Sequence, residues 1–509
     1  MRAILFCFVF CISYLYLNAQ PGTLDRSFGT NGKTYTAYPK EQLEVAVSVV
    51  QSDDKIIVAG NYYSKGKDGF FIMRFLSKGN LDADFGDSGK ALIKFNYFLK
   101  VRDAAIQPNG KIIVTGYGRP NNESGTYDMI TIRLTKEGKL DSSFGSNGKL
   151  ITDFGTDEYS NGVCVQQDGK IILAGVYNGV ECLLVRCKAN GELDSTFGNN
   201  GKVISAVSFI TGYRSVAVQS NKKIIAGGSS GNPNSIFLIG CYKPNGAIDS
   251  SFGSSGFIQT QCSNDGDNLE KLILQKDGKI IAAGRTDLNG LNDTLKDMIA
   301  VRYKNNGALD KTFGKAGIAT ISLQNFYMEA YSAVLQADGK LILAGDGGKS
   351  NDHPDYCIAR LTINGQPDSS FANNGIIFTN IKKSDVAFGA GIQSNGDIIA
   401  AGNSFTNNIN ITGISLVAYK QDSENLNNNF IQSNINIYPN PAKNILHIEG
   451  LSSTQKTNLS VADLSGNIKL QSESITGSYS LNIASLKTGN YLLKIETGDN
   501  AVTKKFMKE

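Results

Sequence analysis

The chain of 509 residues has no tryptophan and only two histidines, His353 and His447. Mechanisms that need a histidine base therefore have at most one candidate outside the C-terminal tail. There is no Gly-x-Ser-x-Gly nucleophile turn, and beyond residue 20 there is no Cys-x-x-Cys pair or zinc-spaced cluster of His and Cys. These absences predict no catalytic residues, no metal site and no cofactor, and they favour a protein that is not an enzyme.

Long apolar runs and blocks of one charge are missing beyond the N-terminus. No later stretch approaches the eighteen apolar residues of a membrane span, so no transmembrane segment is expected. The formal net charge of +4 is spread along the chain, which gives no indication of a nucleic-acid partner. Six cysteines lie beyond residue 20, but they do not recur at one repeat position, so they do not predict a disulfide framework.

The N-terminus has the pattern of a signal peptide over residues 1–19. Met1 and Arg2 give a short positive start, residues 3–17 are almost all apolar, and Ala19 is a small residue suited to cleavage. A lipoprotein is the rival interpretation, but no cysteine comes after the small residues near this point.

Internal repetition dominates residues 24–420. A Leu-Asp-x-Ser-Phe-Gly segment occurs seven times, at residues 24–29, 81–86, 140–145, 193–198, 248–253, 309–314 and 367–372. A second segment, typified by Gln-x-Asp-Gly-Lys-Ile-Ile-x-Ala-Gly, also occurs seven times, beginning at Gln51, Gln107, Gln166, Gln219, Gln275, Gln336 and Gln393. Repeats of this length indicate a solenoid or a propeller.

Each unit predicts four strands. A short apolar strand ends at the Gln, an Asp-Gly or Asn-Gly turn comes next, and the Lys-Ile-Ile segment forms a buried second strand. A third strand alternates, as in residues 128–134, and a fourth begins after the Leu-Asp segment. The first unit supplies only a fourth strand, residues 33–38, whereas the last unit lacks one. The sequence therefore predicts an all-β fold, a seven-bladed β-propeller over residues 20–421 that the N-terminal strand closes.

The two repeated segments resemble the delta-sixty repeat family of large secreted bacterial proteins over residues 24 to about 420. The resemblance implies a propeller-like β-repeat and little about activity. The repeated Asp and Phe are expected to be structural, and the Arg found in five third strands is expected to pair with the repeated Asp. Those five are Arg74, Arg133, Arg186, Arg302 and Arg360.

Ligand binding is expected on one face of the propeller. The connections from second to third strand and from fourth to first strand share that face and differ in every unit, whereas the opposite face carries the repeated residues. Aromatic and charged residues of these connections are the predicted binding residues. They are Tyr62, Tyr63, Tyr97, Phe98, Tyr117, Arg119, Tyr159, Tyr177, Tyr213, Arg285, Phe326, Tyr327, Asp346 and His353.

The repeat ends at residue 421, and residues 422–433 are predicted to be a polar linker. Residues 434–509 alternate and contain turn signals, which predicts a small β-sandwich. This segment resembles the C-terminal sorting domain of the type IX secretion pathway. The resemblance rests on Tyr438, Pro439, Asn440, Pro441, Gly489, Tyr491, Lys504 and Lys505. It implies handling by the type IX machinery and export across the outer membrane, followed by secretion or surface display.

These observations together predict a secreted or surface-displayed binding or adhesion module whose ligand is an extracellular glycan or protein. Two alternatives stay open. One is an extracellular polysaccharide hydrolase or lyase that uses acids converging on the variable face. The other is a structural component of the cell surface.

Overall fold

The computed structural model describes residues 21–38, 42–63, 68–120, 125–207, 211–231, 234–264, 266–287, 296–349, 353–406, 412–421, 435–451, 456–463, 467–497 and 500–509. The predicted signal peptide (1–19) and linker (422–433) lie outside these residues. The chain divides into two compact units. One, the repeat unit, is Pro21–Lys420, and the other, the C-terminal unit, contains Gln421–Glu509.

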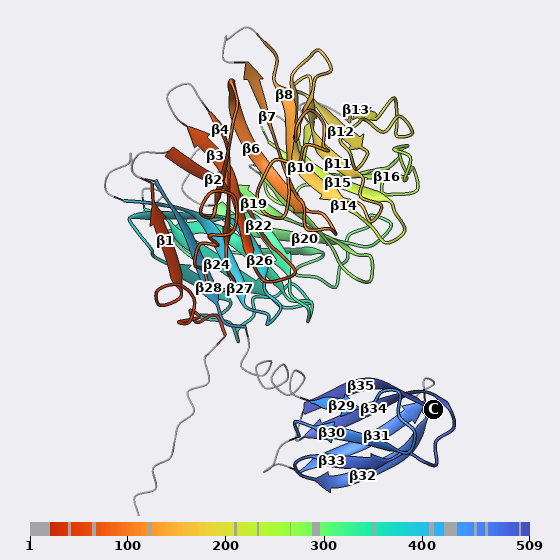
Figure 1. Ribbon diagram of the computed structural model, residues 1–509. Helices are drawn as coiled ribbons and strands as arrows, with labels where there is room; N and C mark the ends of the chain where they lie inside the picture. The colour runs from red at the N-terminus through yellow and green to blue at the C-terminus, as the bar shows by residue number, and fades with distance from the viewer. Residues whose placement is uncertain are drawn as a thin grey trace, which may run out of the picture. The chain divides into compact units, whose positions relative to one another are not determined.

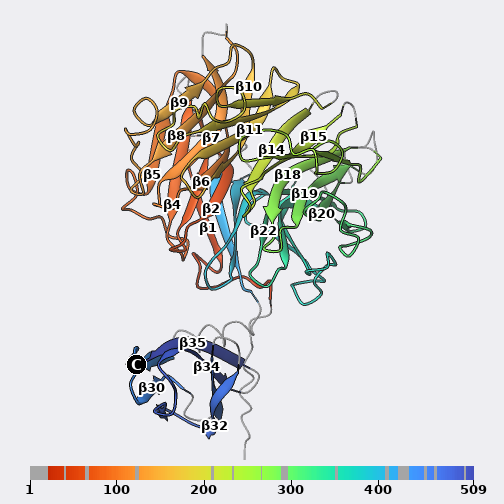
Figure 2. The same ribbon diagram turned by 90° about the vertical axis from the view of Figure 1, so that its right-hand side faces the viewer.

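The described part of the chain is all β, and it contains no helix (Figure 1). The repeat unit has seven four-stranded antiparallel sheets, and within six of them the strands follow sequence order (Figure 2). Repeated four-stranded sheets are the building plan of a β-propeller. The predicted all-β propeller architecture is therefore confirmed.

The strands are grouped here by their place in each sheet. The first, or inner, strands are β2 (Gln42–Val50), β6 (Tyr97–Ile106), β10 (Glu158–Val165), β14 (Thr211–Val218), β18 (Asp267–Leu274), β22 (Tyr327–Leu335) and β26 (Ser384–Ile392). The second strands are β3 (Ile56–Tyr63), β7 (Ile112–Pro120), β11 (Ile171–Tyr177), β15 (Ile224–Ser230), β19 (Ile280–Asp287), β23 (Leu341–Gly348) and β27 (Ile398–Phe405). The third strands are β4 (Gly69–Phe75), β8 (Asp128–Leu134), β12 (Glu181–Cys187), β16 (Ile236–Tyr242), β20 (Lys296–Tyr303), β24 (Asp355–Leu361) and β28 (Thr412–Tyr419). The fourth strands are β5 (Lys90–Lys94), β9 (Lys149–Thr152), β13 (Lys202–Ser205), β17 (Phe257–Thr260), β21 (Ile318–Ile321), β25 (Ile376–Thr379) and β1 (Lys33–Ala37).

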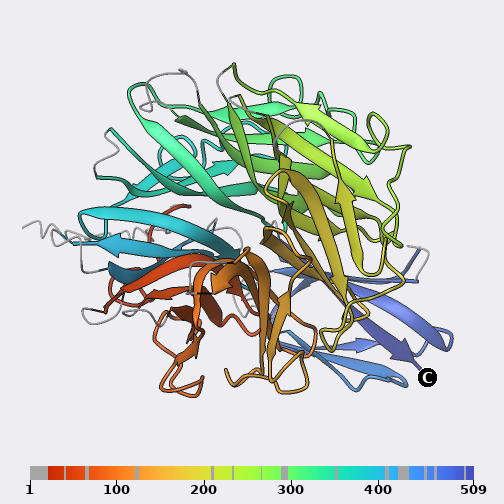
Figure 3. The same ribbon diagram turned by 90° about the horizontal axis from the view of Figure 1, so that it is seen from above.

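Hydrophobic clusters lie between consecutive sheets. The second and third strands are buried on both faces, as in β4, where all seven residues are buried. Their side chains therefore pack against the sheet before and the sheet after. One cluster joins β2, β3 and β4 to β27 and β28, so the last sheet packs against the first. Seen from above, the sheets follow one another around a common centre (Figure 3).

The last sheet is completed by the start of the chain. β1 pairs antiparallel with β28, and the register runs from Lys33 opposite Val417 to Ala37 opposite Gly413. Upstream of β1, the Gly22 amide donates to the Lys420 carbonyl at 2.9 Å. The sheet order is β1-β28-β27-β26, so the N-terminal strand occupies the fourth place.

The predicted ion pair between the strand Arg and the repeated Asp is present in all five sheets that carry this Arg. The Arg Nε to Asp Oδ2 distances are 2.6 to 2.9 Å. The same guanidinium groups lie 4.5 to 4.7 Å from the ring centroid of the repeated Phe. A Lys from the turn between the first and second strands completes the arrangement, as where Lys111 Nζ lies 2.7 Å from Asp141 Oδ2.

The C-terminal unit has two sheets around one hydrophobic core. The three-stranded sheet is β29 (Asn436–Tyr438), β30 (Ile445–Glu449) and β33 (Tyr479–Asn482). The four-stranded sheet is β32 (Ile468–Ile475), β31 (Thr457–Asp463), β34 (Gly489–Thr497) and β35 (Asn500–Lys508). Residues of both sheets, such as Leu446 and Val461, share the core, as in a β-sandwich.

Candidate functional site

Every inner strand of the repeat unit contains one β-bulge at the same place. The extra residue lies five positions before the repeated Gln and interrupts the pairing with the second strand. A bulge redirects a side chain away from the normal alternation of a strand. The seven bulge residues are Ala46, Arg102, Asn161, Arg214, Glu270, Tyr331 and Phe388.

The repeated Gly of each second strand explains why the bulge recurs. This Gly pairs with the residue just before the bulge, as Gly175 does with Ser160. A Cβ atom on Gly175 would lie 1.7 Å from the Tyr159 carbonyl oxygen, and one on Gly60 would lie 2.1 Å from the Glu44 carbonyl oxygen. The close approach of the two backbones therefore requires Gly at this position.

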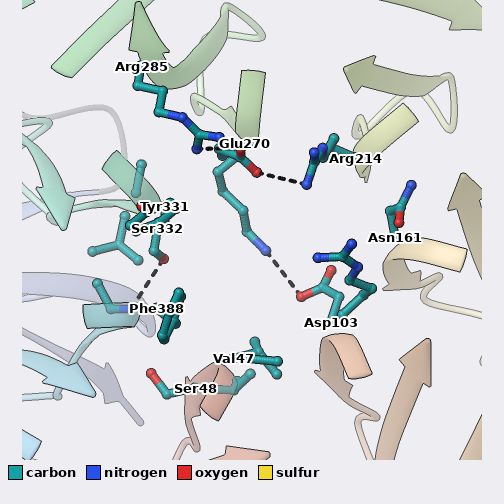
Figure 4. Close-up of a pocket in the computed structure, with 17 residues that line it drawn as sticks. Val47, Ser48, Asp103, Asn161, Arg214, Glu270, Arg285, Tyr331, Ser332 and Phe388 are labelled. Carbon is teal, nitrogen blue, oxygen red and sulfur yellow. Dashed lines mark hydrogen bonds and ion pairs between the residues drawn. The ribbon is translucent and has the colours of Figure 1, made fainter. Parts of the chain in front are cut away.

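All seven bulge residues line one cavity of about 390 Å³, the central cavity (Figure 4). The repeat thus fixes where a side chain enters the cavity, while its chemistry differs from sheet to sheet. Charged groups face one another there. Glu270 Oε1 lies 2.8 Å from Arg285 Nη1, and Glu270 Oε2 lies 3.5 Å from Arg214 Nη1. Lys271 Nζ lies 3.4 Å from Asp103 Oδ1.

A buried hydrogen-bond network adjoins the cavity at Tyr331. The Tyr331 hydroxyl donates to Glu329 Oε2 at 2.5 Å, and Lys296 Nζ lies 2.7 Å from Glu329 Oε1. Asp346 lies opposite Glu329 in the β22–β23 register and is 6% exposed. The Tyr327 hydroxyl donates to Asp346 Oδ2 at 3.3 Å, whereas Oδ1 has no hydrogen-bond partner among the described residues.

Burial raises the pKa of the Asp346 carboxyl to about 7, and the nearby Glu329 charge adds to the effect. The folded protein therefore binds a proton that the unfolded chain releases near pH 4, and stability falls as the pH rises from about 4 to about 7. We expect Asp346→Asn to remove this dependence. Relative to the parent, the variant should gain on the order of 2 kcal/mol in free energy of unfolding between pH 5 and pH 8. Urea unfolding at both pH values measures it, and an unchanged difference would contradict the assignment.

A second pocket of about 330 Å³, the side pocket, opens beside the central cavity. The two share Arg102, Asn161 and Arg214 in their linings. Tyr117 and Tyr159 also line the side pocket, and their ring centroids are 4.7 Å apart. Residues from three consecutive sheets therefore meet at this place.

Tyr127 extends the pair of rings to a cluster. Its ring centroid lies 5.7 Å from that of Tyr117 and 5.3 Å from that of Tyr159. Arg102 Nη2 donates to the Tyr117 hydroxyl at 3.1 Å, and its guanidinium lies 5.4 Å from the Tyr117 ring. No described carboxylate lies within ion-pair distance of Arg102, which is exposed. The side pocket thus combines aromatic faces with a cation available to a ligand.

The structure distributes the predicted binding residues over several environments. Tyr117 and Tyr159 line the side pocket, Arg285 lines the central cavity, and Tyr327 and Asp346 belong to the buried network. The guanidinium of Arg119 lies 5.6 Å from the exposed Phe98 ring and 5.3 Å from the Tyr127 ring.

The other predicted residues are mostly engaged elsewhere. Tyr213 has no exposed surface and shares a 2.6 Å hydrogen bond with Tyr242, so it packs the core. Tyr62 is 7% exposed. The remaining contacts are Tyr63 with Glu44, Tyr97 with Phe95, Tyr177 with Lys202 and Phe326 with Phe378, while His353 is exposed.

The sequence analysis did not single out the bulge residues, Glu329 or Tyr127. Two signals pointed to the bulges: a fixed distance from the repeated Gln, and a Gly inside an otherwise buried strand. No comparable signal marks Glu329 or Tyr127, because their roles depend on neighbours in other strands.

One group of carboxylates in the described residues is close enough to hold a metal ion. It consists of Asp128, Asp153 and Glu158, whose ligand oxygens lie within 4.8 Å of one another. It was not predicted, because the three residues lie on different elements.

In the C-terminal unit, the residues that carried the sorting-domain resemblance lie at the strand ends. The Asn440 side chain accepts a 2.9 Å hydrogen bond from the Met507 amide, which ties the Tyr-Pro-Asn-Pro segment to β35. Tyr491 on β34 donates to the Lys487 carbonyl at 2.9 Å. Lys504 and Lys505 lie on β35, and Gly489 begins β34.

Comparison with protein families gives two matches. Residues 436–509 match the family described as "Secretion system C-terminal sorting domain". Residues 51–85, 107–144, 166–197, 219–252, 275–313 and 336–371 match "Domain of unknown function (DUF5122) beta-propeller". No curated protein matches the chain.

Several solved structures are similar at low identity. A protein of unknown function from Dyadobacter fermentans is 11% identical, with 76% of this chain and 99% of that chain covered and a TM-score of 0.41. PorZ, a surface component of the type IX secretion system of Porphyromonas gingivalis, is 11% identical, with 96% and 86% covered and a TM-score of 0.20. Sqt1 from Chaetomium thermophilum is 11% identical, with 76% and 97% covered and a TM-score of 0.38. TM-scores below 0.5 do not bear on function here. The described residues include no helix long and apolar enough to cross a membrane.

Proposed function

We propose, from the premise that this chain carries DUF5122 beta-propeller repeats and a secretion-system C-terminal sorting domain, that its repeat unit is a binding module for acidic glycans. The sorting domain indicates export by type IX secretion to the cell surface or the extracellular space. Glycans carrying carboxylate or sulfate groups are one class of polymer found there.

In this proposal the repeat unit is a closed ring of seven blades. Support comes from the seven hydrophobic clusters, each of which joins two consecutive sheets, including the last and the first. The pairing of β1 with β28 also supports it, because that pairing covers what would otherwise be an exposed sheet edge. A closed ring gives the central cavity a rigid wall.

The observation that carries the ligand assignment is the composition of the side pocket. Tyr117 and Tyr159 offer ring faces on which a sugar can stack, and Asn161 offers an amide for sugar hydroxyls. Arg102 and Arg214 lie in the same lining, and no acid lines this pocket among the described residues. Guanidinium groups pair well with carboxylate and sulfate oxygens, so the pocket fits an anionic sugar better than a neutral one.

The proposal is tested with the mature chain and three probes: oligogalacturonate, a heparin oligosaccharide and a neutral cello-oligosaccharide. We expect an acidic probe to bind and the neutral probe not to bind in calorimetry. Arg102→Ala combined with Arg214→Ala should weaken binding at least about tenfold, since a charged hydrogen bond contributes about 1.5 to 3 kcal/mol.

Arg26→Ala is the matched control, because Arg26 is an exposed arginine in a Leu-Asp loop and lines neither pocket. It should leave binding unchanged. Equal binding of the neutral and acidic probes, or equal losses in the control and the double variant, would contradict the proposal.

The buried network supports a second candidate, a polysaccharide hydrolase. Asp346 has a carboxyl pKa raised by burial to about 7, as a general acid needs, and Glu329 supplies a second carboxylate beside Tyr331 of the cavity wall. This candidate predicts new reducing ends from an acidic or neutral polysaccharide. The activity should disappear in Glu329→Gln and persist in Arg26→Ala.

A further inference from the structure

Three carboxylates converge between two neighbouring sheets of the repeat unit. Asp128 begins β8, Glu158 begins β10, and Asp153 lies in the connection between β9 and β10. One oxygen of each lies within 4.8 Å of the others. They are spread over two sheets, so the fold itself brings them together.

Backbone hydrogen bonds hold two of the three carboxylates in place. Glu158 Oε2 accepts from the Phe154 amide at 3.0 Å, and its Oε1 accepts from the Thr156 amide at 3.2 Å. Asp153 Oδ1 accepts from the Gly155 amide at 2.7 Å. Each oxygen keeps a further lone pair, so the two groups are oriented and can still bind a cation.

Asp128 provides an independent indication of a ligand. It is 8% exposed, yet its Oδ1 has no hydrogen-bond partner within the described ranges. A buried acceptor without a donor costs about 1 to 3 kcal/mol, more for a charged group. Its own carboxylate is one of the three that meet.

The electrostatics are those of a cation site. The described Lys and Arg form ion pairs with other acids and with none of these three. Burial, then the charges of Asp153, Glu158 and Asp157, raise the pKa of Asp128 to about 6. A bound cation would compensate the repulsion.

The loop does not need all three acids for its fold. Asp267 and Asp385 stand at the position equivalent to Glu158, eight residues before the repeated Gln. Asp385 accepts from the Ile381 amide at 2.7 Å, and Asp267 accepts from the Cys262 amide at 2.6 Å, so each organises its loop in the same way. Among the described residues, only Glu158 has two further carboxylates within 4.8 Å.

We propose that Asp128, Asp153 and Glu158 bind a calcium ion between these two sheets. Calcium takes six to eight oxygen ligands in a flexible geometry, whereas magnesium requires a near-ideal octahedron. Three carboxylates from separate elements fit the first preference, and the exposed Asp153 leaves room for water ligands. The site does not depend on the glycan proposal.

Terbium, which replaces calcium, gives a direct measurement on the mature chain. The chain has no tryptophan, so tyrosine is the only strong sensitiser of terbium emission. Tyr127 and Tyr159 are adjacent in sequence to Asp128 and Glu158. We expect sensitised emission that calcium displaces and magnesium at the same concentration does not, and we expect calcium to raise the thermal midpoint of the parent.

Asp153→Asn should weaken terbium binding at least tenfold. Because Asp153 is exposed, this variant should fold even where Asp128→Asn does not. Asp87→Asn, which removes an exposed carboxylate from another loop, should leave the emission unchanged. Absent emission, equal emission from Asp153→Asn and the parent, or equal displacement by magnesium would overturn the proposal.

Discussion

Replacing Arg133 with alanine is expected to lower the free energy of unfolding of the repeat unit by about 3 to 5 kcal/mol. Arg133 Nε lies 2.7 Å from Asp141 Oδ2, and its Nη2 donates to Ser143 Oγ at 3.0 Å. Its Nη1 donates to the Ala189 carbonyl, which belongs to the next sheet. The variant would leave Asp141, only 7% exposed, without this partner and would remove a bond between sheets.

Urea unfolding of the parent and the variant measures this loss. Arg102→Ala is the matched control, because Arg102 lies in the same sheet but is exposed and has no carboxylate partner among the described residues. It should change stability by less than about 0.5 kcal/mol. A loss below about 1 kcal/mol in Arg133→Ala would mean that Lys111, 2.7 Å from Asp141, is sufficient by itself.

Removing residues 21–38 is expected to prevent the repeat unit from folding as a stable monomer. The deletion removes β1 and exposes the edge of β28, a ready template for pairing with other chains. It also removes Phe28, which is fully buried in the cluster between the last and first sheets. Truncation of one buried Phe to alanine costs about 3 to 5 kcal/mol, and the lost strand pairing adds to this.

The measurement compares chains that begin at residue 21 and at residue 39 by size-exclusion chromatography and thermal unfolding. The shorter chain should aggregate or unfold without a cooperative transition. A synthetic peptide of residues 21–38, added during refolding, should restore the monomer because it supplies the missing strand. A shorter chain that remains monomeric with an unchanged midpoint would refute closure by the N-terminal strand.

The repeat was readable because each unit encodes its own local structure. Strand β8 was predicted with the bounds that the structure has, Asp128–Leu134, since its alternation and its flanking turns are local signals. In the C-terminal unit, β32 was missed. Its sequence is Ile-Lys-Leu-Gln-Ser-Glu-Ser-Ile and most of it is polar and little buried, so the apolar pattern that marks other strands is weak there.

The binding residues were less predictable, because their environment depends on neighbours far away in sequence. Tyr213 and Tyr117 look alike in sequence, as tyrosines of an inner and a second strand. Tyr213 faces the core against Tyr242, whereas Tyr117 faces the side pocket. Only the packing of one sheet on the next separates these cases.

The sequence by itself determined the all-β repeat architecture, the pairing of the strand Arg with the repeated Asp, and the export domain, because each rests on residues at fixed local spacing. The tertiary structure alone decided which side chains meet at the centre. A bulge in each inner strand turns one variable residue into the central cavity, and Asp128, Asp153 and Glu158 converge from different elements. Such meetings depend on the placement of whole sheets around a common centre, and no spacing along the chain records that placement.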